Sequence, residues 1–235
     1  MDTPTVVFED QDMMVIEKPA GWISTDTATA KDAKTVQRWL AENYEFPIFS
    51  NPQCRNGIVH RLDKETSGVM LVAKNEASFT ALQAQFKERT VKKTYIALVH
   101  DKTPPEGTVT ATVGRLPWNR ERFGVFAGGR DSETDFVATG YYQKDGFDYT
   151  LVTLTPKTGR THQIRIHMKY LHHPLVSDPF YGGRKMARKD RVWCPRLFLH
   201  AASISFLHPT TKSPLAFESK LPEDLSKAFA TLTKI

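Results

Sequence analysis

One carboxylate, Asp63, stands in a polar turn between two apolar segments of the chain. Residues 57–62 have the character of an extended lead-in, and the uninterrupted apolar run from Val69 to Ala73 predicts a buried strand. The turn therefore presents Asp63 at the edge of a strand. An Asp in a turn most often hydrogen-bonds nearby backbone groups, so the residue types alone leave a chemical and a structural role open.

Positive charge is concentrated in three stretches, although the net charge of the whole chain is only +6. The stretches are residues 115–130, 157–173 and 184–196, and the first interleaves Arg115, Arg120, Arg122 and Arg130 with Trp118, Phe123 and Phe126. Cations that meet phosphates, beside rings that stack on unpaired bases, are typical of proteins that bind single-stranded RNA. A single basic cluster is often only a solvated face, but three clusters of one sign favour an RNA partner.

The common motifs of other catalytic classes are missing from the sequence. It has no GxSxG elbow, no Gly-rich phosphate loop and no HExxH pair. Histidines 162, 167, 172 and 173 lie close together, but no acidic or thiol ligand accompanies them, so we interpret them as helix-surface histidines that face RNA. Cys54 and Cys194 form no CxxC pair, which predicts two reduced thiols. We expect neither a metal nor a cofactor.

Residues 60–68, HRLDKETSG, resemble the HRLDxxTSG signature of the RluA-type pseudouridine synthases, which isomerise uridine to pseudouridine in structured RNA. Other family landmarks resemble segments that follow the same order along the chain. These segments are residues 17–21 for the opening turn, 92–95 and 159–167 for the second and third motifs, and 177–182 and 199–201 for the later landmarks. The resemblance spans about residues 5 to 220, and it implies the catalytic domain of that family.

The resemblance implies three catalytic residues. Asp63 would act as a nucleophile at the sugar or the ring, or as the base of an elimination route. Burial favours the protonated form of a carboxyl group, so Asp63 needs a cation, and Arg165 is the family's match. A guanidinium suits this task because its planar fork can make two bonds to one carboxylate. Tyr95 resembles the residue that stacks on the target base and can take the C5 proton, although a Tyr in such a strand is otherwise core packing.

The target uridine must leave its base stack before it can react. Arg61 resembles the family residue that moves into the vacated place, and His60 either supports the turn or contacts the RNA. We expect phosphate contacts from Arg160, Lys169, Arg184, Arg188 and Arg191. Because the catalytic pattern begins within the first ten residues, we expect no S4 domain ahead of it. The short members of the family modify tRNA or large-subunit ribosomal RNA, which are the substrates we expect.

Two other functions compete with this interpretation. A non-catalytic RNA-binding or ribosome-assembly protein could retain the fold, but the intact Asp63, Tyr95 and Arg165 argue against it. A nucleoside glycosidase could also use a carboxylate at a ribose. Such enzymes usually pair two carboxylates or use a metal, and neither is evident in the sequence.

Apolar runs and helical periodicity predict the elements that would position these residues. We expect strands at residues 6–9, 13–17, 69–74, 94–99, 109–113, 135–142, 149–155 and 197–206, and helices at 35–44, 76–89, 161–171 and 222–234. Strands without a regular β-α-β alternation predict an α+β fold, built on a mixed, mostly antiparallel sheet that is flanked by helices. Residues 19–34, 45–57 and 115–130 show no periodicity and are expected to be long loops.

The length of 235 residues and the absence of a Gly/Ser linker predict a single catalytic domain over residues 1–235, which we expect to be monomeric. The longest apolar run has five residues, far short of the roughly 20 that a membrane-spanning helix needs. The first residues also lack the basic and apolar blocks of an export signal. We therefore expect a cytoplasmic protein with no membrane partner.

Overall fold

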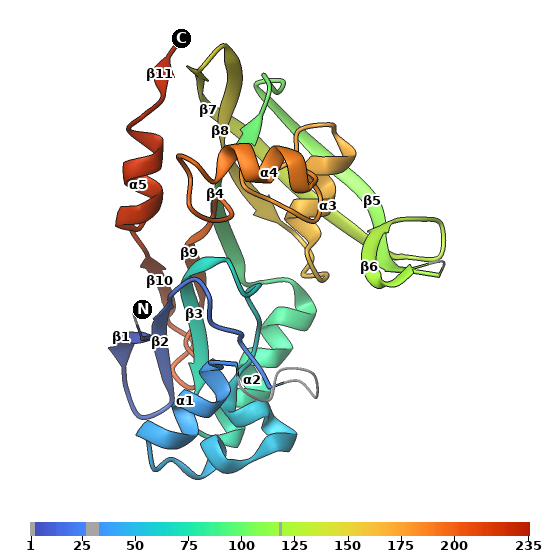
Figure 1. Ribbon diagram of the computed structural model, residues 1–235. Coiled ribbons are helices and arrows are strands. Elements are labelled where there is room, and N and C mark those ends of the chain that lie inside the picture. Colours follow the sequence, from blue (N-terminus) through green and yellow to red (C-terminus); the bar gives the residue numbers. More distant parts are fainter. Residues whose placement is uncertain (1–2, 27–32, 118) are drawn as a thin grey trace. The chain divides into compact units, whose positions relative to one another are not determined.

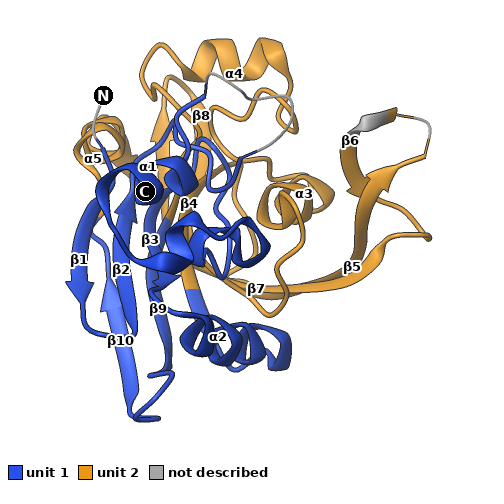
Figure 2. Cartoon of the chain, turned by 90° about the horizontal axis from the view of Figure 1, so that it is seen from below, with its two compact units in different colours: residues 1–93, 201–220 blue, residues 94–200, 221–235 orange. Residues whose placement is uncertain are grey.

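The computed structural model describes residues 3–26, 33–117 and 119–235 (Figure 1). The chain divides into two compact units (Figure 2). Unit 1 contains residues 1–93 and 201–220, and unit 2 contains residues 94–200 and 221–235. No helix among the described residues is long and apolar enough to cross a membrane.

Unit 1 is built on an antiparallel sheet. Its strands are β1 (Thr5–Glu9), β2 (Met13–Lys18), β3 (Ser67–Ala73), the unit 1 part of β9 (Leu199–Leu207) and β10 (Pro214–Glu218). The order is β1-β2-β3-β9, with β10 on β9. All seven residues of β3 are buried, as a continuous apolar run predicts for an inner strand. The register pairs Lys18 with Gly68, so the ends of β2 and β3 that adjoin the Asp63 turn lie side by side.

The helices of unit 1 start at polar caps. Helix α1 (Val36–Asn43) begins after Thr35, whose hydroxyl accepts the Arg38 N–H, and α2 (Glu76–Glu88) begins after Asn75, whose side chain accepts the Ser78 N–H. Residues 45–57, expected to be a loop, fold into the 3-10 helices η1 (Pro47–Ser50) and η2 (Pro52–Gly57). Both begin at a proline, whose fixed φ suits the first helical position. They are too short to show helical periodicity.

Unit 2 carries the second set of strands. They are the unit 2 part of β4 (Lys92–His100), β5 (Glu106–Leu116), β6 (Asn119–Val125), β7 (Arg130–Lys144), β8 (Phe147–Pro156) and β11 (Thr233–Lys234). The order is β4-β8-β7-β5-β6, with β11 on β7. The helices are α3 (Gln163–Tyr170), α4 (Arg184–Asp190) and α5 (Glu223–Phe229). The fold class is α+β with a mixed, mostly antiparallel sheet and flanking helices, as predicted.

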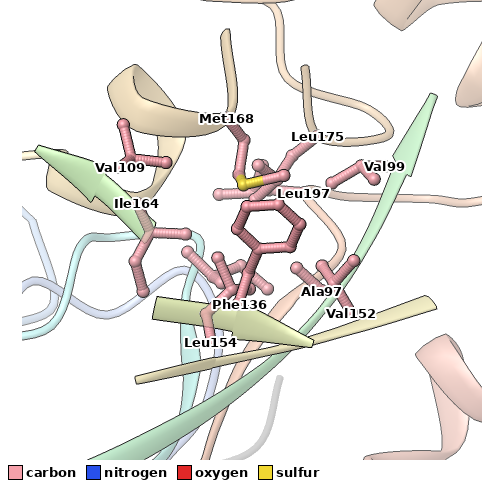
Figure 3. Close-up of a cluster of buried hydrophobic side chains, with 11 residues drawn as sticks. Ala97, Val99, Val109, Phe136, Val152, Leu154, Ile164, Met168, Leu175 and Leu197 are labelled. Atoms are coloured by element: carbon pink, nitrogen blue, oxygen red, sulfur yellow. The ribbon is translucent and has the colours of Figure 1, made fainter. Parts of the chain in front are cut away.

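The core of unit 2 forms where α3 packs on the sheet (Figure 3). Ile164 and Met168 of α3 are buried against Phe136 of β7 and Leu154 of β8, and Leu171 packs against the same cluster. The helix expected within residues 161–171 therefore turns one apolar face toward the sheet. That face also fixes the direction in which the rest of α3, including Arg165, can point.

Further stretches differ from the sequence-based expectation, including β10, where no strand was expected. Residues 115–130, expected to be a loop, contain the end of β5 and all of β6, an edge strand whose charged residues hide the alternation of a strand. The predicted helix 222–234 ends at Phe229, and a short strand follows. Helix α4 was missed because only Ala187 and Asp190 of its seven residues are buried. Trp118, one of the rings expected to stack on RNA, lies outside the described residues, and the side chain of Arg120 is not described either.

Candidate active site

The backbone on the N-terminal side of Asp63 is fixed by one hydroxyl group in unit 1. Ser24 Oγ accepts the Leu62 N–H at 2.9 Å and donates to the Leu62 carbonyl at 2.8 Å. Both Leu62 and Ser24 are buried, while Asp63 is partly exposed. The residue directly before the carboxylate therefore has both of its backbone polar groups satisfied by one side chain.

The C-terminal side of Asp63 is fixed by the opening turn of the chain. The Lys64 carbonyl accepts the Gly21 N–H at 2.7 Å and lies 3.4 Å from Lys18 Nζ. The Lys18 side chain is buried, and its Nζ also donates to the carbonyls of Pro19 and Trp22 at 2.9 Å each. Residues 17–21, identified only as a family landmark, thus have a physical role in holding the Asp63 turn.

His60 connects the turn to the rest of unit 1. Its Nε2 accepts the Leu71 N–H of β3 at 2.9 Å, and its ring stacks on Phe86 of α2 with centroids 4.9 Å apart. Burial, with a contribution from the charge of Lys93, lowers the pKa of His60 to about 3, so the ring is neutral. These contacts suit the supporting role considered for His60, and a contact with RNA stays a prediction. Arg61 is exposed.

Steric crowding explains why a glycine ends the HRLDKETSG segment. Gly68 has φ +121°, and a Cβ there would lie 2.2 Å from the backbone oxygen of Ala201. Any larger residue would push β9 away from β3. The first motif and the last family landmark are therefore packed directly on each other within unit 1.

Arg165 of α3, in unit 2, is held by a carboxylate that the sequence analysis did not identify as its partner. Its Nε and Nη2 donate to the two oxygens of Asp178 at 2.8 and 2.9 Å, and both side chains are almost fully buried. Oδ1 of Asp178 also accepts the N–H groups of Phe180 and Tyr181 at 2.9 and 3.1 Å. The bidentate pair orients the guanidinium before any substrate binds.

Tyr95 of β4 is partly buried and packs against the core cluster of unit 2. This is the packing role that the sequence left open, and a role against the target base stays a prediction. Asp63 belongs to unit 1, whereas Tyr95 and Arg165 belong to unit 2. The expected pairing of Asp63 with Arg165 therefore joins residues of two units and also stays a prediction.

The third motif, residues 159–167, is anchored by Gln163. Its amide oxygen accepts the Arg160 N–H at 2.9 Å and the Thr158 hydroxyl at 2.7 Å, and its amide nitrogen donates to Thr134 Oγ1 at 3.0 Å. The guanidinium of Arg160 reaches the Asp131 carbonyl at 3.4 Å. This motif is therefore a connector between α3 and β7 as well as the carrier of Arg165.

One expectation about the histidines is wrong. His167 is fully buried. Its ring nitrogens are hydrogen-bonded there, since the hydroxyls of Ser132 and Thr134 lie 2.9 Å from Nε2 and Nδ1, respectively. Burial lowers the pKa of His167 to about 4, so the ring is neutral and cannot face RNA. His172 is exposed, as expected. Among the described residues, no group of three His, Cys, Asp or Glu side chains could hold a metal ion.

The basic residues expected to meet phosphates are mostly at the surface of unit 2. Lys169 ends up on the exposed side of α3, and Arg184 and Arg188 lie on the exposed side of α4. Arg191, directly after α4, is also exposed, and Arg160 is partly exposed. Helix α4 thus presents a basic surface, which fits the predicted interaction with a phosphate backbone.

Comparisons with known proteins agree with these motifs. A family model described as RNA pseudouridylate synthase matches residues 12–170. The Bacillus subtilis protein YlyB, described as an uncharacterized RNA pseudouridine synthase, is 36% identical over 230 residues, which cover 97% of this chain and 73% of that protein. Ribosomal large subunit pseudouridine synthase D of Pseudomonas aeruginosa is 37% identical over 227 residues, which cover 93% and 68% of the two chains.

A solved structure extends the comparison to the fold. Human RNA pseudouridylate synthase domain containing 1 has a TM-score of 0.75 and 27% identity, and the match covers 99% of this chain and 89% of that one. The family model, the curated relatives and the shared fold thus agree with the family that the motifs indicate. The chain belongs to the RNA pseudouridine synthases of the RluA type, enzymes that isomerise uridine to pseudouridine in RNA.

Proposed function

We propose that Asp63 is the catalytic carboxylate of this enzyme and that its substrate is a uridine of large-subunit ribosomal RNA. The observation that carries the catalytic assignment is the clamp on the Asp63 turn, in which Ser24 holds Leu62 and Lys18 with Gly21 holds the Lys64 carbonyl. Such double support is typical of a side chain whose position matters to chemistry. The substrate class is supported by the relatives named ribosomal large subunit pseudouridine synthase D.

The reaction needs neither a redox change nor an energy source. The N1–C1′ bond breaks, the uracil turns over, a C5–C1′ bond forms, and the C5 proton leaves. Asp63 serves as the nucleophile at the sugar or the ring, or as the base that starts an elimination route. Each route needs Asp63 in its ionised form.

Arg165 keeps Asp63 ionised in this proposal. A carboxylate that loses water when RNA binds becomes harder to ionise, and a nearby guanidinium opposes that change. The ion pair with Asp178 supports this role, because it fixes the orientation of Arg165 within unit 2. Tyr95 stacks on the target base and takes the C5 proton.

RNA recognition combines base flipping with phosphate contacts. Arg61, which is exposed two residues before Asp63, fills the place that the target uridine leaves. The exposed residues of the basic surface on and beside α4, Arg184, Arg188 and Arg191, bind phosphates together with Lys169 and Arg160. Action as a monomer, without a metal, and in the cytoplasm remains a prediction.

Mapping of pseudouridines tests this function. RNA from cells with and without the gene is treated with a carbodiimide that marks pseudouridine, and the cells without the gene are complemented with the wild type, Asp63→Ala or Asp145→Ala. Asp145 is an exposed carboxylate of the turn between β7 and β8, so its variant is a matched control.

We expect a large-subunit ribosomal RNA site that is lost without the gene and restored by the wild type and Asp145→Ala only. A site lost from tRNA instead would contradict the substrate assignment. Restoration of the site by Asp63→Ala would contradict the catalytic one.

A further inference from the structure

Four rings of unit 2 form a cluster to which no particular nucleotide has been assigned above. They are Phe123 of β6, His162 before α3, and Phe180 and Tyr181 before α4. The centroid of His162 lies 5.9 Å from that of Phe123, 5.8 Å from that of Tyr181 and 6.4 Å from that of Phe180. Phe123 comes from the stretch 115–130, to which no family motif was matched. We call these four residues the ring cluster.

The ring cluster is held in place by hydrogen bonds. His162 Nδ1 and the Tyr181 hydroxyl are hydrogen-bonded at 2.9 Å, and the backbone of His162 is fixed in the left-handed region with φ 56°. The N–H groups of Phe180 and Tyr181 donate to the buried carboxylate of Asp178. The rings of His162 and Tyr181 and the backbone that carries Phe180 are therefore set before a ligand arrives, which lowers the entropy cost of binding.

Two guanidinium groups lie against the ring cluster. Arg115 is 5.0 Å from the centroid of Phe123, and Arg165 is 5.0 Å from that of Tyr181 and 5.7 Å from that of Phe180. Both cations are within the range of a cation–π contact. Arg115 is exposed, so it can also meet an anion from solvent. The cluster therefore combines aromatic faces with positive charge.

Phe180 is the ring that a ligand can reach. The residue is 53% exposed, whereas Phe123 and Tyr181 are only partly exposed. An aromatic face beside cations suits a nucleotide whose base has left its stack, because the base has a π face and the nucleotide carries a phosphate. A half-exposed ring in this setting is a stacking surface.

We propose that the ring cluster is a binding site for an unpaired nucleotide of the RNA substrate other than the target uridine, with its base stacked on Phe180 and a phosphate of the same strand beside Arg115. This inference rests on RNA being the substrate, and on the assignment of the target base to Tyr95. It gives a role to the pairing of β5 with β6, whose register sets Arg115 of β5 opposite Phe123 of β6. The site would select RNAs with an unpaired base at a fixed distance from the target.

Binding of two single-stranded oligomers tests the proposal. The probes are an eight-residue oligoadenylate and an oligomer of the same length in which every nucleotide is abasic. The variants are Phe180→Ala, Phe180→Leu and Phe180→Trp, with Phe147→Ala as the control. Phe147 is 57% exposed in the same unit and lies at the start of β8, outside the ring cluster.

If the base stacks on the ring of Phe180, the affinities of the variants should follow the presence of an aromatic ring rather than the apolar area of the side chain. Phe180→Ala and Phe180→Leu should each weaken oligoadenylate binding about 30-fold, the middle of the range found for base–aromatic stacking, while Phe180→Trp keeps it. Binding of the abasic oligomer should be the same for all variants. Wild-type affinity in Phe180→Ala, an equal loss with the abasic oligomer, or an equal loss in Phe147→Ala would overturn the proposal.

The isomerase reaction separates this inference from the proposed function. A wild-type protein that binds oligoadenylate through Phe180 but forms no pseudouridine would contradict the catalytic assignment alone. A wild-type protein that forms pseudouridine, and whose Phe180→Leu variant binds oligoadenylate normally, would contradict the ring-cluster site alone. The Leu variant keeps a large apolar side chain at position 180 but lacks the ring, so a folding failure of the Ala variant leaves the test intact.

Discussion

Arg165 and Asp178 form a buried bidentate ion pair, with Nε–Oδ2 and Nη2–Oδ1 distances of 2.8 and 2.9 Å. The same carboxylate accepts the N–H groups of Phe180 and Tyr181, so it organises the turn before α4 as well as the guanidinium. One buried acid thereby fixes the predicted catalytic cation and the proposed stacking ring. Its removal should affect stability, isomerisation and RNA binding together.

Substitution of Asp178 tests this relationship. Asp178→Asn leaves the buried Arg165 without its countercharge, which typically costs about 3–5 kcal/mol of unfolding free energy. Urea unfolding and the rate of pseudouridine formation measure the two effects. The control is Asp224→Asn, which breaks the pair with Arg196; because Asp224 is 42% exposed, we expect a loss of at most about 1 kcal/mol there. Equal losses in the two variants would contradict the special role of the Arg165–Asp178 pair.

Ser24 should act on catalysis through Leu62 and the Asp63 turn. Ser24→Ala removes the hydroxyl that binds the buried N–H and carbonyl of Leu62, so we expect a loss of about 1–3 kcal/mol in stability. The turnover number should fall because the Asp63 carboxylate is no longer held in place. The KM for RNA should stay the same, because the residues that bind RNA are unchanged. Ser226→Ala is the control, because it removes a single hydrogen bond, from the hydroxyl of Ser226 in α5 to the carbonyl of Leu221. A turnover number unchanged by Ser24→Ala would leave Ser24 with a packing role only.

His167 should make the protein less stable in acid. Its folded pKa of about 4 lies below the usual 6.5, so the unfolded chain binds more protons between these values and stability falls as the pH is lowered through that window. The contribution is on the order of 3 kcal/mol. His167→Gln should flatten the fall of urea-unfolding free energy between pH 6.5 and 4.5, and His172→Gln, at an exposed site, should not. Parallel pH curves for the two variants and the wild type would contradict the assignment.

RNA binding should weaken steeply with salt. If about six phosphates are neutralised, the plot of log affinity against log salt has a slope between about −4 and −5 on the single-strand coefficient. Replacement of Arg184 and Arg188 of α4 by Gln should make the slope shallower by about 1.4, because two contacts are lost. Lys227→Gln on α5, at an exposed residue already paired with Glu223, is the control. An unchanged slope in the double variant would exclude α4 from the interface.

The sequence predicted the elements that carry an apolar period and missed those that do not. The inward face of α3 follows from Ile164 and Met168, and the buried strand β3 follows from its uninterrupted apolar run. Strand β6 and helix α4 expose most of their residues, so their formation depends on pairing and on anchors distant in sequence. No local sequence pattern predicts β6 or α4.

The candidate site was predicted through short motifs, and its supports were not. Asp63, Tyr95 and Arg165 stand in segments that resemble a family, whereas Ser24 and Asp178 act on residues 38 and 13 positions away. His167 was misjudged for a related reason. Its basic neighbours along the chain suggest a surface, but the hydroxyls of Ser132 and Thr134, over thirty positions away, form a buried polar site for its ring.

Release of tritium from C5-labelled uridine tests the central claim about Asp63 most directly. Total RNA labelled with [5-³H]uridine in cells that lack the gene contains the substrate whatever its identity, and free uracil is measured in the same samples. Wild type and Asp145→Ala should release tritium without free uracil, and Asp63→Ala and Asp63→Asn should release none. Tritium release by Asp63→Ala at the wild-type rate would contradict the account, and free uracil from the wild type would show hydrolysis in place of isomerisation.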